Sequence, residues 1–148
     1  MKVVWVLLSM LAISFSANAG EGMKTIASKH SFADTQVRLE AVLKEKGMIV
    51  FAKVDHADGA KQFDLKMQPA TVTIFGHPKG GTPFMVASPE SAIDFPLKGL
   101  VWEDASGKVF YSYNTLSYIV DRHHIKGQED LTKKLNGALD AIAKATTE

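Results

Sequence analysis

The sequence contains no cysteine among its 148 residues. This absence excludes thiol catalysis, iron–sulfur clusters and thiolate zinc sites, because each of them needs a cysteine sulfur. It also excludes the lipid anchor of a bacterial lipoprotein, which is attached to a cysteine at the cleavage site. Any metal site must therefore be built from His, Met, Asp or Glu side chains.

The sequence also lacks an apolar run of the roughly 20 residues that a membrane-spanning helix needs. The apolar stretch from Val3 to Phe15 is shorter, follows Lys2, and ends just before Ala17-Asn18-Ala19. A positive start, a short apolar stretch and a small-x-small site are typical of a cleavable signal peptide. We therefore expect residues 1–19 to be a signal peptide that is removed after Ala19. Residues 20–148 are then one α+β domain, periplasmic or secreted, with no stable membrane anchor.

An excess of either charge is absent once the signal peptide is set aside. Residues 1–19 carry one lysine and no acid, so the remaining 129 residues hold 16 basic and 16 acidic side chains. A nucleic-acid partner is not expected, because it requires a basic face that neutralises phosphates. Zero net charge gives little repulsion between copies and is compatible with self-association.

Complete catalytic motifs are missing as well. The chain has no G-x-S-x-G, H-E-x-x-H or EF-hand pattern. The segment from Gly76 to Thr82 is similar to a phosphate loop, but Thr82 stands where that motif needs lysine. Two interpretations remain: Gly80, Gly81 and Thr82 present backbone N–H groups to a small anion, or Thr82 caps a helix that begins at Pro83 after a loop.

The elements that are present indicate an α+β fold. Ser31 to Asp34 forms a capping box, which predicts a helix that extends to Lys46. An apolar stripe predicts a long C-terminal helix, and Gly137 within it is expected at a close packing contact. Strands are expected without regularly alternating helices, which favours a mostly antiparallel sheet with helices packed on one face and short inserted helices. The expected strands are Lys24–Ser28, Met48–Val54, Ala70–Phe75, Lys98–Glu103 and Lys108–Tyr113.

Three of these strands carry more apolar surface than one core requires. Met48 to Val54 is apolar on both faces, which indicates a strand buried on both sides or one whose second face meets a partner. The last two expected strands form a hairpin with aromatic side chains on both faces. We expect these side chains either to pack in the core or to form a dimer surface or the wall of a pocket. They are Trp102, Phe110, Tyr111 and Tyr113.

Histidines supply the candidate chemical groups. Asp55-His56 stands at the end of a strand, where the carboxylate either orients the imidazole or caps the next short helix. His123-His124 is poorly spaced for a helical metal pair, and His123 continues an apolar stripe, so packing is the favoured interpretation. Candidate metal ligands are His56, His77, His123 and Met85, with copper or zinc as the cation.

Several segments together resemble the bacterial domain-of-unknown-function family 302. They are Val54-Asp55-His56, Phe75-Gly76-His77-Pro78, Gly81 to Met85, Asp94 to Leu97, and Val101 to Asp104 with Gly107. The resemblance covers roughly residues 24–146, although His77 stands where the family more often has Asn. It implies an α+β fold similar to TATA-binding-protein-like domains, with the order β-α-β-β-β-β-α, and a homodimer, but no activity or cofactor.

The sequence is compatible with three functional hypotheses. The first is a non-enzymatic accessory or small-ligand-binding protein, with a pocket formed at strand ends. The others are a metal-handling protein and a hydrolase or isomerase that uses Asp55 and His56. The candidate pocket residues are Asp55, His56, Phe75, Gly76, His77, Gly81, Thr82, Met85 and Pro96.

Overall fold

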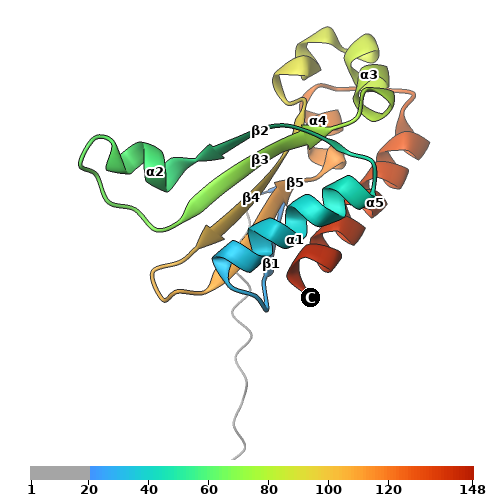
Figure 1. Cartoon of the computed structure of the whole chain (residues 1–148). Helices are drawn as coiled ribbons and strands as arrows, with labels where there is room; N and C mark the ends of the chain where they lie inside the picture. The colour runs from blue at the N-terminus through green and yellow to red at the C-terminus, as the bar shows by residue number, and fades with distance from the viewer. Residues whose placement is uncertain (1–20) are drawn as a thin grey trace, which may run out of the picture.

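The computed structural model describes residues 21–148, so the expected signal peptide lies outside the described residues. This part of the chain forms five strands and six helical segments, with β4 and β5 directly consecutive and without regular alternation (Figure 1). The strands are β1 (Met23–Ala27), β2 (Ile49–Asp55), β3 (Ala70–Gly76), β4 (Leu97–Glu103) and β5 (Val109–Asn114). The helices are α1 (Phe32–Glu45), α2 (His56–Lys61), α3 (Pro78–Ala87), the 3-10 helix η1 (Pro89–Ile93), α4 (Leu116–Arg122) and α5 (Glu129–Thr147).

The strands form one antiparallel sheet in the order β1-β5-β4-β3-β2. Helices α1 and α5 lie side by side over one face of this sheet, and the hydrophobic core fills the space between them (Figure 1). Tyr111, Phe75 and Leu39 are among the fully buried side chains of that core. The expectation of an α+β fold with a mostly antiparallel sheet is confirmed.

Helix α1 follows its sequence signals closely. The Ser31 hydroxyl accepts a hydrogen bond from the backbone N–H of Asp34 at 3.1 Å, which satisfies one of the free donors of the first turn. Leu39 and Leu43 are fully buried on the core side. The helix ends before Gly47, whose φ of 67° is the left-handed conformation that glycine adopts without strain.

Strand β2 differs from the expectation of burial on both sides. All seven of its residues are exposed, because β2 is the edge strand of the sheet and pairs only with β3. Phe51 and Val54 are 53% and 42% exposed. Burial depends on the position of a strand in the sheet, which the apolar pattern of the strand does not encode. The alternative, that its second face meets a partner, stays a prediction.

The glycine-rich segment after β3 also differs from the expectation of a loop. Helix α3 begins at Pro78 rather than at Pro83, and His77 is its N-cap. The backbone N–H of Lys79 donates to His77 Nδ1 at 3.1 Å, and the N–H of Gly80 donates to the His77 carbonyl at 2.9 Å. Pro78 suits the first helical position, where its missing N–H has no intrahelical partner. The predicted cap at Thr82 is therefore wrong.

The second face of the sheet carries apolar side chains that stand outside the core. Strand alternation places them on the side opposite α1 and α5. Trp102 and Phe110 stack there with ring centroids 4.7 Å apart. We call this set the outer sheet face; it comprises the half-buried Val72, Ile74, Leu100 and Trp102, together with Phe110, which is buried at 7% exposure.

Within residues 21–148, no helix combines the length and the apolar character needed to cross a membrane.

Candidate functional site

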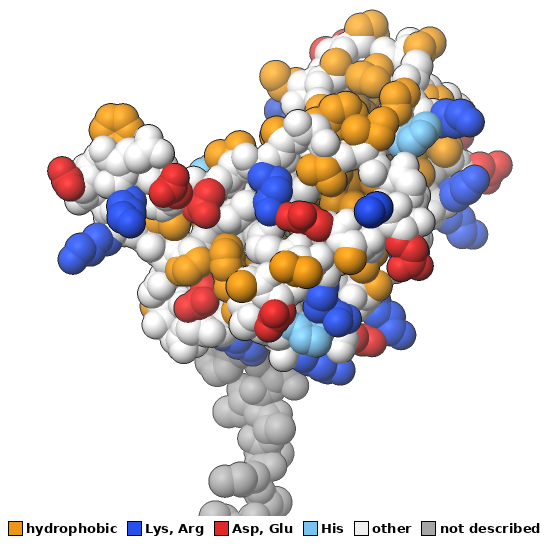
Figure 2. Space-filling model, viewed as in Figure 1, with side chains coloured by type: hydrophobic (Ala, Val, Ile, Leu, Met, Phe, Trp, Pro, Cys, Tyr) orange, Lys and Arg blue, Asp and Glu red, His pale blue; other side chains and the backbone are white. Residues whose placement is uncertain are grey.

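A cavity of about 440 Å³ lies at the end of the sheet where β2 begins and β3 ends. Its walls come from the end of α1, from β2, α3 and α5, and from the segment that joins η1 to β4. Figure 2 shows hydrophobic side chains gathered on this face where α3 rises beside the end of α1, with basic and His side chains at the margin. The apolar wall includes Met48, Phe51, Met85, Phe95, Leu131 and Leu135.

Two glycines let α3 approach the other walls of the cavity closely. A Cβ atom at Gly80 would lie 3.6 Å from Leu135 Cδ1, and one at Gly81 would lie 3.5 Å from Phe95 Cδ1. These separations are ordinary van der Waals contacts, so a methyl group is accommodated whereas a longer side chain would project against the wall. The glycines therefore keep open the space between α3, α5 and Phe95.

The polar lining of the cavity is basic. Lys46, Lys79 and Lys134 line it together with His77 and Thr82, and no Asp or Glu is among the lining residues. The five ion pairs found within residues 21–148 include none of these three lysines. The ammonium groups at the margin are thus not neutralised by a carboxylate of the described chain.

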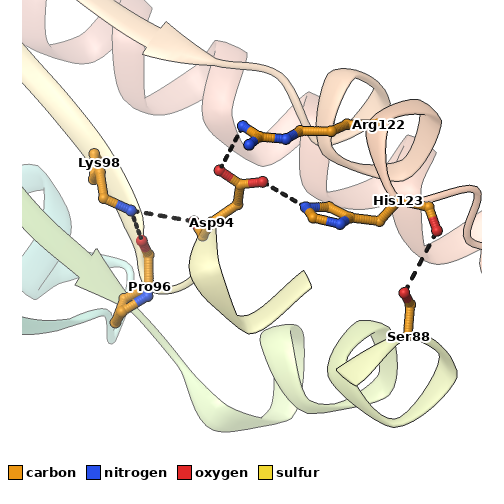
Figure 3. Close-up of polar contacts among 6 residues, drawn as sticks. All are labelled: Ser88, Asp94, Pro96, Lys98, Arg122 and His123. Carbon is orange, nitrogen blue, oxygen red and sulfur yellow. Dashed lines mark hydrogen bonds and ion pairs between the residues drawn. The ribbon is translucent and has the colours of Figure 1, made fainter. Parts of the chain in front are cut away.

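A group of polar contacts holds the η1–β4 segment in place (Figure 3). Asp94 binds His123 through Oδ2 and Nε2 at 2.6 Å, and Arg122 Nη1 approaches Asp94 Oδ1 at 3.4 Å. The side chains of Asp94 and His123 are only 16% and 8% exposed. Lys98 Nζ donates to the carbonyl of Pro96 at 3.0 Å. Because Phe95 and Pro96 line the cavity, these contacts fix one of its walls.

The structure brings most of the predicted pocket residues together and leaves three of them elsewhere. Phe75 belongs to the buried core and is fully inaccessible. Asp55 and His56 lie at the opposite end of β2, because Ile49 pairs with Gly76 whereas Asp55 pairs with Thr71. The predicted residues that line the cavity are Gly76, His77, Gly81, Thr82, Met85 and Pro96.

Asp55 and His56 begin helix α2. The Asp55 carboxylate accepts a hydrogen bond from the backbone N–H of Asp58 at 2.9 Å and acts as the N-cap, and His56 is exposed in the first turn. The capping interpretation is therefore confirmed. The Asp55 carboxylate is bound at a helix end, and the exposed His56 lies at the opposite end of β2 from the cavity, an arrangement that does not favour the hydrolase hypothesis.

Two of the four candidate metal ligands lie at one place: His77 and Met85 line the cavity, where His77 Nδ1 already accepts a hydrogen bond from the backbone N–H of Lys79. His123 binds Asp94, and His56 lies on α2. The described part of the chain contains no group of three or more His, Asp or Glu side chains placed to hold a metal ion. The prediction that His123 is packed rather than exposed is confirmed, but its partner Asp94 was not anticipated.

Sequence reasoning missed the contributions of α1 and α5 to the cavity. Leu131 and Leu135 were visible as an apolar stripe, and Lys134 stands beside them in the same helix. The apolar stripe predicts that one side of α5 is buried. It does not predict that the first turns of α5 contact α3 rather than the sheet. Only the packing of the two helices reveals the site.

Two curated proteins are similar to this chain in amino-acid sequence. One is the "Fluoride-specific ion channel FluC 1" of Brucella suis biovar 1, which is 39% identical over 113 residues, covering 76% of this chain and 44% of the relative. "Fluoride-specific ion channel FluC 2" of Brucella melitensis biotype 1 is also 39% identical over 113 residues, covering 76% of this chain and 42% of the relative. The chain thus spans less than half the length of each of these two relatives.

A solved structure shares the fold. The crystal structure of an uncharacterized conserved protein DUF302 from Bacillus stearothermophilus superimposes with a TM-score of 0.77 and 15% sequence identity, covering 85% of this chain and 98% of that one. The family model described as "Domain of unknown function DUF302" matches residues 24–142, which is most of the sequence. The chain therefore belongs to the DUF302 family, as the segments around Gly76-His77-Pro78 and Phe95-Pro96 had suggested.

Proposed function

We propose that this protein is an exported, non-enzymatic binding or accessory protein that holds a small molecule in the cavity between α3, α1 and α5. The observation that carries the proposal is the cavity itself, with a volume of about 440 Å³ and a largely apolar wall. Small-molecule sites commonly enclose about 300–1,000 Å³ and combine apolar walls with a few polar groups. The described residues bring no nucleophile, base and orienting group together at this cavity, which favours binding over catalysis.

The named relatives are compatible with an accessory role. The FluC 1 protein of Brucella suis is called a fluoride-specific ion channel, and this chain matches only 44% of its length. We therefore assign to the shared segment a binding function that accompanies the named activity, rather than the activity itself.

Filling the cavity tests the binding function. In Leu135→Trp, a larger side chain occupies the space between α5 and α3, and in Gly81→Leu a new side chain projects from α3 toward Phe95. A ligand that stabilises the wild type at about 100 times its dissociation constant raises the free energy of unfolding by about 2.7 kcal/mol. Thermal unfolding with a ligand library should show such stabilisation in the wild type and its loss in both variants.

The control for these variants is Val37→Trp, because Val37 is 68% exposed on α1 and does not line the cavity. Its response to ligands should equal that of the wild type. Stabilisation that persists in both filled variants would place the binding site elsewhere and would contradict the proposal.

Export is a separate part of the proposal, supported by the apolar stretch from Val3 to Phe15 and the Ala17-Asn18-Ala19 site. Expression of the full-length chain in a Gram-negative bacterium, followed by fractionation, measures it. The protein in the periplasmic fraction should begin at Gly20 by intact mass. A chain that retains Met1 and stays in the cytoplasm would refute this part.

We also propose that two copies associate through the outer sheet face. Half-buried side chains such as Val72, Ile74 and Leu100 lie outside the core there, and β2 is an exposed edge beside them. Contiguous apolar surface of this kind marks interaction sites, and equal numbers of charges of both signs offer little opposition to pairing. Sedimentation velocity should give the mass of two chains.

A further inference from the structure

We propose that the ligand of the cavity is a small amphiphile with an apolar body and one anionic head, a carboxylate or a phosphate. This inference rests on the binding function proposed above and names the class of molecule that the site would accept. It is carried by two features of the same cavity: the apolar character of its walls and the sign of the charges at its margin.

The walls require an apolar body. Met48, Phe95, Leu131 and Leu135 are partly buried against the core and also line the cavity, so they present apolar surface on the inside of the hollow. Removing such surface from water is favourable in proportion to its area, and a hydrocarbon body achieves this whereas a hydrated ion does not. Met85 adds a flexible side chain that adapts to the shape of an occupant.

The margin requires a negative charge. Lys46 stands at the end of α1, Lys79 in the first turn of α3, and Lys134 on α5, so three separate elements each contribute a lysine to the lining of one cavity. No carboxylate lines the cavity, although the protein without its signal peptide holds equal numbers of acidic and basic side chains. The long stems of lysines lie along apolar surface while their charged ends remain near water, which suits the mouth of such a site.

The start of α3 does not provide the anion site. The N–H of Lys79 donates to His77 Nδ1, and the N–H groups of Gly80 and Gly81 donate to the His77 carbonyl at 2.9 and 3.2 Å. These donors are already occupied, so a phosphate loop built on the backbone is not available. Recognition of the head group is left to the lysine side chains, which take up a carboxylate or a phosphate without fixed geometry.

Calorimetric titration with matched probes tests the ligand class. The protein is purified after expression of the full-length chain and titrated with decanoate, decyl phosphate, decanol and decyltrimethylammonium. Each charged probe stays below the concentration at which it forms micelles, and decanol stays below its solubility limit. Decanoate or decyl phosphate should bind at least about tenfold more tightly than decanol, and the cationic probe should bind most weakly. The anionic advantage should shrink at high salt because the lysines are solvent-exposed.

The two anionic probes distinguish the sources of the ligand. A preference for decanoate indicates a free fatty acid, whereas a preference for decyl phosphate indicates a lipid head group. Sodium fluoride at the same ionic strength is the control for an anion without an apolar body, and it should not displace a bound amphiphile.

Charge reversal supplies matched variants. Lys46→Glu with Lys134→Glu places two acids at the mouth of the cavity, and Lys44→Glu with Lys133→Glu makes the same charge change at neighbouring exposed positions that do not line it. The first pair should lower the affinity for decanoate about tenfold or more and leave that for decanol unchanged. The second pair should change either affinity by less than about threefold, since exposed charges further away are screened.

The outcomes separate this inference from the function on which it rests. Equal affinities for decanoate and decanol, both abolished by Leu135→Trp, would overturn the anionic head while leaving the binding function intact. Failure of every probe to bind the wild type would overturn the amphiphile and leave the binding function to the ligand library, whereas binding that survives the filled cavity would contradict both. Equal losses of decanoate affinity in the two charge-reversal pairs would also overturn the assignment, because the effect would then be one of net charge.

Discussion

At the residue scale, Asp140 on α5 is an exposed carboxylate that accepts two short hydrogen bonds. Its Oδ1 atom accepts hydrogen bonds from Lys24 Nζ at 2.6 Å and from the Tyr113 hydroxyl at 2.5 Å. The bond from Lys24, followed by that from Tyr113, lowers the pKa of Asp140 below its ordinary value of 3.8. A carboxylate whose pKa is lower in the folded state stabilises the fold above its unfolded pKa, and this stability is lost as the pH falls through the folded pKa.

Asp140→Asn should therefore destabilise the protein at pH 7 and have little effect in acid. The Asp140 side chain is 49% exposed, so solvent screens the interaction and the expected loss is about 0.5–1 kcal/mol. Urea unfolding at pH 7 and at about pH 2, which is well below the ordinary carboxyl pKa, measures it. Glu148→Gln is the control, because its contact with Lys144 is 3.9 Å long and exposed. An identical loss at both pH values would show that the charge of Asp140 is not the cause.

Asp94 is the residue on which one wall of the cavity depends. Asp94→Ala leaves the buried His123 ring without the partner that its Nε2 atom has at 2.6 Å, which should cost about 1–3 kcal/mol of unfolding free energy. It should also weaken amphiphile binding, because Phe95 and Pro96 follow Asp94 directly.

The matched control for Asp94→Ala is Asp121→Ala, an exposed carboxylate on α4 beside Arg122. Urea unfolding and the titration with decanoate should separate the two variants. If both unfold at the same urea concentration, the contacts of Asp94 do not support the wall.

At the scale of elements, helix α5 contains an interior glycine that lowers the stability of the helix. Gly137 lies in its interior, and a Cβ atom there would meet nothing within 4 Å, so the expected close packing contact is absent. Gly137→Ala should raise the free energy of unfolding by about 0.5–1 kcal/mol, because alanine loses less backbone entropy in a helix. Gly99→Ala is the opposite case, since its Cβ would lie 2.5 Å from the Tyr111 hydroxyl, and urea unfolding should show it to be destabilised. Destabilisation by Gly137→Ala would mean that α5 is not continuous at this point.

The elements that sequence reasoning identified are those whose signals are local. The cap at Ser31, for example, lies within one helical turn of the backbone N–H of Asp34 that it satisfies. Helix α3 was placed too late because Pro83 resembles a helix start, whereas Pro78 fills that position and His77 supplies the cap. Residue types alone do not decide between two prolines that both suit a first turn.

The candidate site was predictable only where its residues follow one another in the chain. Gly81, Thr82 and Met85 were assigned to a pocket because they belong to one segment at a strand end. Lys46 and Lys134 come from α1 and α5, and their approach to that segment is a consequence of helix packing. Asp55 was misplaced because β2 and β3 run in opposite directions. The C-terminal ends of neighbouring antiparallel strands therefore lie at opposite ends of the sheet, which puts Asp55 far from the segment that follows β3.

At the scale of the whole molecule, the two faces of the sheet differ in what covers them. Helices α1 and α5 cover one face and bury residues such as Val101 and Tyr111 (Figure 1). Alternation along the same strands puts Leu100 and Ser112 on the other face, where Ser112 receives a hydrogen bond from Trp102 Nε1 at 2.9 Å. This outer sheet face has apolar character but no place in the core of the described chain. A second copy would cover it with an identical surface, as the two-fold symmetry of most dimers requires.

The proposed dimer predicts which substitutions separate the copies. Ile74→Lys with Leu100→Lys places two charges on the outer sheet face, and burying them in a dimer would require desolvation without partners. Sedimentation velocity should show the wild type as a dimer and this variant as a folded monomer with an unchanged far-ultraviolet circular dichroism spectrum. Val37→Lys with Val86→Lys is the control, because both valines are exposed on helices, at 68% and 76%. A wild type that sediments as a monomer, or a variant that remains dimeric, would exclude the outer sheet face as the interface.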